Sequence, residues 1–271
     1  MLSAFPAGKA LYLPEVFIMN EERLFHLDLP SSLRVGYAIL PGDPGRVDKI
    51  AEHLSSPELA GCNREFRSVI GMLDGERVIV TSTGIGGPSA AIALEELARI
   101  GVHHAIRTGT CGGIQLSVAA GDLVIPTAAV RMEGTSKEYA PIEFPAAADH
   151  DVLTELVNAA RELGFSYHTG IIQSKDSFYG QHSPATMPVH YELENKWDAW
   201  KRLGVLASEM ETAALFTVGA VRGIKLGCVL HALWNQERKD KGLAEQAEFD
   251  TEAAIRTAVL ALKKITGKTD E

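Results

Sequence analysis

The sequence predicts an α/β fold, a three-layer sandwich in which helices cover both faces of a central mixed β-sheet. Two patterns predict this class. Short apolar, β-branched segments alternate along the chain with longer segments whose apolar residues recur at helical spacing. Several apolar segments also run directly into glycine-rich stretches, as the strands of a largely buried sheet do. We expect the 271 residues to form one domain, with an irregular N-terminal arm over residues 1–23.

The first half of the chain predicts a strand, a glycine loop and a helix, then a hairpin and a second helix. The apolar segment 35–40 ends in "PGDPGR", where Asp43 is the expected helix cap and Pro44 the first helical residue of a helix reaching 54. Asp74 and Gly75 predict the turn of a hairpin between strands at 67–73 and 76–82. The helix after "GIGGPS" is expected over 90–101, closed by Gly101.

The second half continues the alternation of strands and helices. Further strands are expected at 103–107, 121–130, 167–174 and 226–233. Helices are expected at about 151–163, after Ser208, and at about 251–265. In such sheets a ligand lies in the crevice beyond the carboxyl ends of the strands, and the glycine-rich segments 41–46 and 107–113 fall there.

Composition excludes several classes of function. The formal net charge of −9, spread along the chain, argues against a protein that binds the phosphate backbone of nucleic acid. The sequence shows neither an apolar run of membrane-spanning length nor a secretory leader, so we expect a cytoplasmic protein that does not bind a membrane. Three widely spaced cysteines predict reduced thiols and no zinc site.

The segment "SEMET", residues 208–212, has two interpretations. In the first, Ser208 and Glu211 form a capping box at a helix start, a common use of S-x-x-E. In the second, the helix start faces a ligand, Glu211 accepts sugar hydroxyls, and Ser208 caps the helix alone. The motif by itself does not decide between them.

Two glycine-rich segments carry an arginine each, Arg46 in the first and Arg107 in the second. Glycines let backbone amides approach an oxyanion, and an arginine fork strengthens the binding, so each segment is a candidate phosphate site. Neither matches the nucleoside triphosphate or dinucleotide glycine motifs. Ordinary turns with solvated arginines are the structural alternative.

Seven motifs, taken in order, carry a resemblance to a known family. They are "PGDPGRV", "REF", "STGIGGPS", "RTGTCGGI", "GDLVI", "DSFYGQ" and "SEMETAALF", and they extend over about residues 24–266. In their order and spacing the chain resembles the nucleoside phosphorylase superfamily of hexameric type, and within it the uridine phosphorylases. The resemblance implies cleavage of uridine, deoxyuridine or thymidine by inorganic phosphate. From uridine the products would be uracil and ribose 1-phosphate, formed without a cofactor in a hexamer built as a trimer of dimers.

The resemblance also implies the residues of the site. Arg107, Glu211 and Gln181 would be catalytic. Phosphate would be bound by Gly42, Arg46, Arg107 and Thr110, with Arg64 supplied by the neighbouring subunit. The ribose would be held by Thr110, Met210 and Glu211, with His26 from the neighbour, and the base by Cys111, Gly112, Phe178, Gln181 and Glu209.

The base-binding region departs from the family pattern. Ser183 stands where the family has an arginine two residues after the glutamine, and the arginine expected after Asn235 is also absent. Because the leaving uracil gains negative charge, it still needs a hydrogen-bond donor. We expect Lys175 to supply it, with Arg238 as the weaker candidate and a solvated Lys175 as the structural alternative.

Further features bear on the choice of substrate. Asn235 stands where purine-specific relatives have an aspartate that protonates the leaving purine, and an asparagine cannot do so. Glu65 and Ser89 match residues near a monovalent cation in some relatives, whereas no structural metal is expected. Cys111 lacks a paired histidine and is not expected to be a nucleophile. The alternatives are a purine nucleoside phosphorylase or nucleosidase, and a non-catalytic protein that binds or senses nucleosides.

Overall fold

A mixed ten-stranded sheet organises the computed structural model, which describes residues 23–243 and 246–267. Its strands in chain order are β1 (Tyr37–Pro41), β2 (Ser55–Asn63), β3 (Phe66–Leu73), β4 (Glu76–Thr81), β5 (His104–Gly113), β6 (Leu123–Met132), β7 (Ala146–Ala147), β8 (Tyr167–Lys175), β9 (Ala207–Glu209) and β10 (Lys225–Asn235). The predicted α/β class with a central mixed sheet is confirmed.

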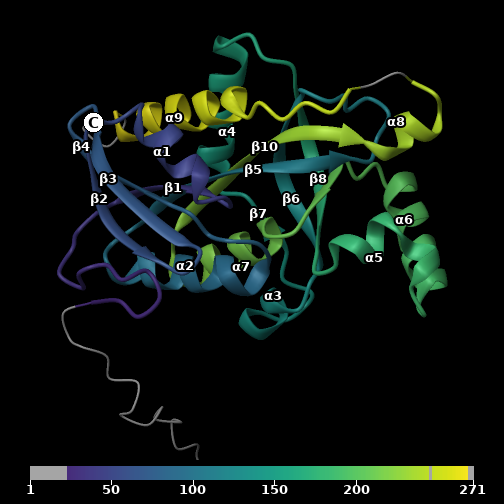
Figure 1. The fold of residues 1–271 in the computed structure, drawn as a ribbon, viewed down its shortest axis with the longest axis horizontal. Helices are drawn as coiled ribbons and strands as arrows, with labels where there is room; N and C mark the ends of the chain where they lie inside the picture. Colours follow the sequence, from purple (N-terminus) through teal and green to yellow (C-terminus); the bar gives the residue numbers. More distant parts are fainter. Residues whose placement is uncertain (1–22, 244–245, 268–271) are drawn as a thin grey trace, which may run out of the picture.

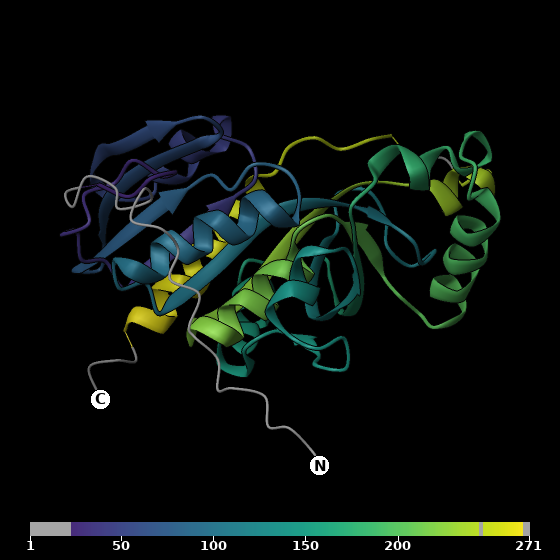
Figure 2. The ribbon, with the colours of Figure 1, turned by 90° about the horizontal axis from the view of Figure 1, so that it is seen from below.

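Helices lie on both faces of this sheet (Figure 1). In chain order they are α1 (Gly45–Ala51), α2 (Gly87–Arg99), α3 (Thr135–Tyr139), α4 (His150–Glu162), α5 (Phe178–His182), α6 (His190–Arg202), α7 (Thr212–Arg222), α8 (Gln236–Asp240) and α9 (Glu252–Thr266). One apolar core includes α2 and α7, which contact each other, and the other includes α1, α4 and α9. Figure 2 shows α5 and α6 at the end of the molecule opposite β2 and β3.

Five strands close into a ring. Strand β10 pairs in parallel with β5 and antiparallel with β6, while β6 pairs with β8. The short strand β9 completes the ring, because it pairs with both β8 and β5. Four further strands extend from β5 in the order β1, β4, β3, β2, and the short β7 pairs with β6. Because of this ring, the ends of strands that are far apart in the sequence lie close together.

The hairpin predicted from Asp74 and Gly75 is confirmed. Both residues have positive φ angles, 50° and 93°, as a type I′ turn requires, and Leu73 pairs with Glu76 across it. Gly101, with φ of 100°, follows the end of α2 as predicted.

The prediction of a loop at 107–113 is wrong, because β5 continues to Gly113. The glycines there make room for side chains instead of turning the chain. A Cβ on Gly109 would lie 2.9 Å from Nη2 of Arg107, and one on Gly113 would lie 2.5 Å from Nδ2 of Asn235. Only glycine permits these approaches without displacing the neighbours.

Other boundaries differ from the prediction for physical reasons. Pro44 is the N-cap of α1 and not its first residue, while the Asp43 carboxylate accepts a hydrogen bond from Gly45 N at 2.8 Å. Strand β2 and helix α6 were not predicted, because β2 is mostly exposed and α6 has no buried residue, so neither shows a clear apolar period. The predicted arm over 1–23 lies outside the described residues except for Arg23. Within the described ranges, every helix is too short or too polar to cross a bilayer.

Candidate active site

A cavity of about 580 Å³ lies where the chain leaves β1 and β4 and at the carboxyl-terminal ends of β5, β8, β9 and β10. We call it the nucleoside cavity, after the ligand that the family resemblance implies. The sequence places a ligand at this edge of the sheet. Most of the residues implied by the resemblance line it, as does Lys175: they are Gly42, Arg46, Arg107, Thr110, Cys111, Gly112, Phe178, Glu209, Met210 and Glu211.

Two arginines give the cavity unsatisfied donors. Arg107 is only 3% exposed, and its Nε and Nη1 atoms are buried without a hydrogen-bond partner among the described residues, as is Nη1 of Arg46. Burial, and then the charge of Arg107, lower the pKa of Arg46. Burial alone would lower the pKa of Arg107, but the negative charges of Glu211 and Glu209 outweigh burial and raise that pKa. Buried, unpartnered guanidinium groups suit an oxyanion that enters the cavity.

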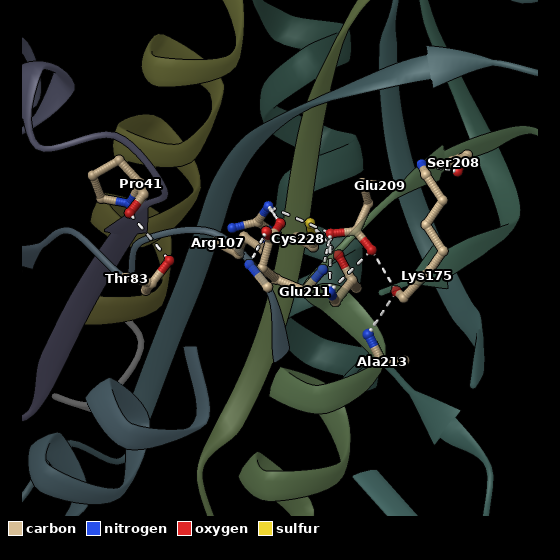
Figure 3. Close-up of polar contacts among 12 residues, drawn as sticks. Pro41, Thr83, Arg107, Lys175, Ser208, Glu209, Glu211, Ala213 and Cys228 are labelled. Atoms are coloured by element: carbon tan, nitrogen blue, oxygen red, sulfur yellow. Dashed lines mark hydrogen bonds and ion pairs between the residues drawn. The ribbon is translucent and has the colours of Figure 1, made fainter. Parts of the chain in front are cut away.

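Glu211 faces this cationic group (Figure 3). Its Oε1 accepts from Gly86 N at 2.6 Å, and its Oε2 accepts from Nη2 of Arg107. Burial raises the pKa of the Glu211 carboxyl, Arg107 opposes the shift, and Glu209 adds to it. The side chain makes no capping bond to α7, so the capping-box interpretation is wrong.

Glu209, and not Ser208, satisfies the start of α7. Its carboxylate accepts hydrogen bonds from the amides of Glu211 and Thr212 at 2.9 to 3.0 Å, and one from the hydroxyl of Ser174. Ser208 lies in β9, so the prediction that it caps the helix is also wrong. A carboxylate fits this place because it accepts several amide bonds and complements the helix dipole.

Lys175 lines the cavity beside Phe178, the residue that the resemblance implies for stacking on the base. Its ammonium group donates to Oγ of Ser208 at 2.7 Å and is 5.9 Å from the centre of the Phe178 ring. Burial lowers its pKa from 10.5 to about 8. Arg238 does not line the cavity, and its Nη1 donates to the carbonyl of Leu116 at 2.7 Å. Of the two expected donors, Lys175 is therefore the one that lines the cavity.

The pKa of Lys175 predicts a pH profile. The ammonium form holds the donated proton and the charge, so kcat/KM for uridine should fall as pH rises through about 8, approaching tenfold per pH unit. Initial rates between pH 6 and 10 would measure it, with the same series on Lys175→Met as the control. A wild-type profile that stays flat to pH 10 would contradict the role of Lys175.

Two aromatic residues in the wall were not anticipated. His182 lies 4.3 Å from Phe178 and 5.0 Å from Trp234, measured between ring centres, and all three rings line the cavity. Burial, and then the charge of Lys175, lower the pKa of His182. The sequence could have indicated both residues, because each is adjacent to a predicted residue: His182 follows Gln181, and Trp234 precedes Asn235.

Three predicted residues lie away from the nucleoside cavity within the described chain. Gln181 lines a neighbouring cavity, although its Oε1 accepts from Oγ of Ser208 at 3.3 Å. Nδ1 of His26 lies 2.8 Å from Oε1 of Glu96, and Arg64 is exposed in the turn between β2 and β3.

The residues suggested for a monovalent cation contact each other. Ser89 donates to Oε1 of Glu65 at 2.8 Å, and Glu65 lines the nucleoside cavity. In the described part of the chain, no group of three or more His, Cys, Asp or Glu side chains is placed to hold a metal ion. Burial raises the pKa of the Cys111 thiol far above its usual range, which disfavours a nucleophilic thiolate.

Asn235 has a structural role that the sequence did not reveal. Its Nδ2 donates to the carbonyls of Gln115 and Val118, both at 2.8 Å, and its Oδ1 accepts from Arg238 N. The side chain is buried and does not line the nucleoside cavity. Its position outside the cavity does not support a direct role for residue 235 in the choice of substrate.

Replacing Asn235 with aspartate is expected to destabilise the protein without creating a purine enzyme. The new carboxylate would face two carbonyl oxygens where an amide donated, which should cost about 2 to 3 kcal/mol. Urea unfolding of Asn235→Asp and of the surface control Asn195→Asp would measure the cost. Inosine phosphorolysis by folded Asn235→Asp would instead give this residue a direct role in base choice.

The chain belongs to the phosphorylase superfamily, which matches residues 36–266. A uridine phosphorylase from Treponema pallidum is 52% identical over 239 residues, 88% of this chain and 93% of that protein. A uridine phosphorylase from Escherichia coli is 39% identical over 252 residues, 91% and 100% of the two chains. A guanosine phosphorylase from Halorubrum lacusprofundi is 41% identical over 232 residues, 83% and 92% of the two chains.

Proposed function

We propose that this protein is a uridine phosphorylase of pyrimidine salvage, a pentosyltransferase that converts uridine and inorganic phosphate to uracil and ribose 1-phosphate. The observation that carries the proposal is one cavity holding buried, unpartnered guanidinium atoms, a buried carboxylate and a buried lysine. The similarity to uridine phosphorylases over most of the chain supports it. Deoxyuridine and thymidine are proposed as further substrates.

At one end of the cavity, Arg46 and Arg107 would bind phosphate together with Gly42 and Thr110. Their unpartnered nitrogens offset the desolvation of the anion. A phosphate oxygen attacks C1′ of the ribose as the bond to N1 of uracil breaks, and the electron pair leaves with the base. The positive charge that develops on the sugar is stabilised by the adjacent phosphate.

Glu211 and Met210 would hold the ribose. When phosphate takes the free nitrogens of Arg107, the Glu211 carboxylate stays fixed by the Gly86 amide and by Nη2 of Arg107. It then accepts bonds from the sugar hydroxyls at the side of the ring where charge develops. Holding both reactants in this geometry is itself a large part of such catalysis.

Phe178 would stack on the base, near Cys111, Gly112 and the backbone of Glu209, while Lys175 donates to a carbonyl oxygen of the departing uracil. Gln181 would turn from Ser208 to the base edge, which frees its amide for the two-pronged bond implied by the family. Lys175 and Gln181 then share the charge that two family arginines would otherwise take.

We also infer the larger assembly from the family. A single domain with the three-layer α/β/α arrangement would assemble as a cytoplasmic hexamer, a trimer of dimers. In each dimer His26 and Arg64 would complete the neighbour's site. Their positions away from the cavity of their own chain are compatible with this arrangement. A monovalent cation at Glu65 and Ser89 is a further proposal, supported by their contact.

One assay tests the proposal against its alternatives. The protein is incubated with uridine, thymidine, inosine or guanosine, with and without phosphate, and the free base is quantified. We expect uracil release that requires phosphate. Release without phosphate would indicate a nucleosidase, and tight binding without turnover a nucleoside sensor. A preference for guanosine would place the protein with its Halorubrum relative, which is named a guanosine phosphorylase.

A further inference from the structure

A second cavity of about 370 Å³ lies beneath α6. A thin partition of side chains separates it from the nucleoside cavity. Lys175 lines both cavities, Ser208 lines the nucleoside cavity, and Gln181 lines this second cavity. Ser208 links the other two residues, because its Oγ accepts from Nζ of Lys175 at 2.7 Å and donates to Oε1 of Gln181 at 3.3 Å. We call this space the α6 cavity.

Buried polar atoms without partners mark the α6 cavity as more than a packing defect. Gln173 is 1% exposed, and its Nε2 contacts Sδ of Met132 at 2.9 Å. A thioether sulfur accepts hydrogen bonds but cannot donate them, so the amide nitrogen faces it and the carbonyl Oε1 is left unpaired. The indole Nε1 of Trp200 and Nε2 of Gln181 are also buried without partners among the described residues. Buried polar groups are usually hydrogen-bonded, so these atoms are available to a polar ligand.

The walls of the α6 cavity suit a flat, uncharged molecule. Met132, Leu193 and the rings of Trp197 and Trp200 supply apolar surface. The lysines on the helix are already paired, Lys201 with Glu237 at 3.4 Å and Lys196 with Glu192 at 3.5 Å. With these ion pairs made, the lysines of the helix offer little to attract a phosphate or another anion.

We propose that the α6 cavity is a second binding site, for a planar lactam heterocycle such as a free nucleobase. The ligand's N–H would donate to Oε1 of Gln173, and an adjacent carbonyl would accept from Nε1 of Trp200. Uracil presents an N–H beside a carbonyl in this way.

The position of α6 agrees with a binding role. The helix contributes no buried side chain to the core, so its apolar residues face this cavity and not tightly packed neighbours. Figure 1 shows α6 at the edge of the molecule, away from α1 and α9. The site is distinct from the proposed substrate site, and occupancy of one does not require occupancy of the other.

Equilibrium dialysis with radiolabelled uracil, in phosphate-free buffer, tests the proposal. Wild-type protein should bind two uracils per subunit, one in each cavity. Trp200→Phe removes only the indole donor, and Gln173→Met removes only the amide, so each should weaken one of the two binding events at least tenfold. Trp197→Phe is the matched control, because its indole already donates to Glu237 at 2.7 Å. It should retain both binding events.

A crystal soaked with uracil gives an independent measurement that does not depend on variants. Electron density for the base against Gln173 and Trp200 is expected. Water alone in the α6 cavity, or binding unchanged in both Trp200→Phe and Gln173→Met, would overturn the proposal. The phosphorolysis assay tests the proposed function independently of the α6 cavity, because Trp200→Phe and Gln173→Met should turn over uridine within about twofold of wild type. Absence of turnover in all proteins, with binding to the α6 cavity intact, would instead refute the proposed function alone.

Discussion

Arg107→Ala is expected to lower kcat/KM for phosphate by about a thousandfold or more, because it removes the buried donors aimed at the anion. The same change should lower the free energy of unfolding by about 3 to 5 kcal/mol, since Glu209 and Glu211 lose the cation between them. Phosphate-dependent uracil release and urea unfolding would measure the two effects.

Arg46→Ala separates catalysis from folding. Arg46 also presents an unpartnered nitrogen to the cavity, but its carboxylate neighbour Asp43 is exposed and 3.8 Å away. The variant should lose phosphate affinity and remain as stable as wild type. Arg222→Ala, which removes an exposed pair with Glu95, controls for loss of a surface arginine. Retention of full activity by Arg107→Ala would contradict the phosphate site.

Lys175→Met is expected to change activity and stability in opposite directions. Uridine turnover should fall by about a hundredfold, because the donor to the departing base is lost. The free energy of unfolding at pH 7 should rise by about 2 kcal/mol. Burial lowers the pKa of Lys175 from 10.5 to about 8, so its charge costs the folded state fully below that pH, and the cost fades as the pH rises from about 8 to 10.5. The hydrogen bond lost in the variant offsets part of the gain.

Arg238→Met is the matched control for Lys175→Met, since Arg238 is the rival donor and lies outside the nucleoside cavity. It should turn over uridine within about twofold of wild type. If Arg238→Met loses activity while Lys175→Met does not, the assignment of the donor is reversed. If both retain activity, Gln181 alone recognises the base edge.

The sequence predicted the fold class well because its strands are apolar and buried, and alternate with amphipathic helices. The prediction of a loop in place of the end of β5 was wrong, because in the sequence the glycines that make room for the side chains of Arg107 and Asn235 cannot be told from glycines that turn the chain. The sequence prediction missed α6, because a helix that covers a cavity and not a core lacks a strong apolar period.

The candidate site was predictable as a set of motifs, but its internal contacts were not. Ser208 and Glu211 match a capping pattern, yet Glu209 between them caps the helix, because β9 turns the Ser208 hydroxyl toward Lys175. The buried bonds of Asn235 depend on carbonyls more than a hundred residues earlier in the chain, and local sequence carries no sign of them. His26 and Arg64 are proposed to act in the neighbouring subunit, so assembly, and not the folding of one chain, would set their contacts.

The closed ring of strands has a consequence for how the protein is made. Strand β10, which spans Lys225–Asn235, pairs with β5 along most of its length and also closes against β6. Contacts between segments so distant in sequence form slowly. A nascent chain on the ribosome therefore lacks the cavity wall until nearly all of it has been synthesised. A ligand of this cavity is therefore expected to stabilise the complete chain and not its earlier folding intermediates.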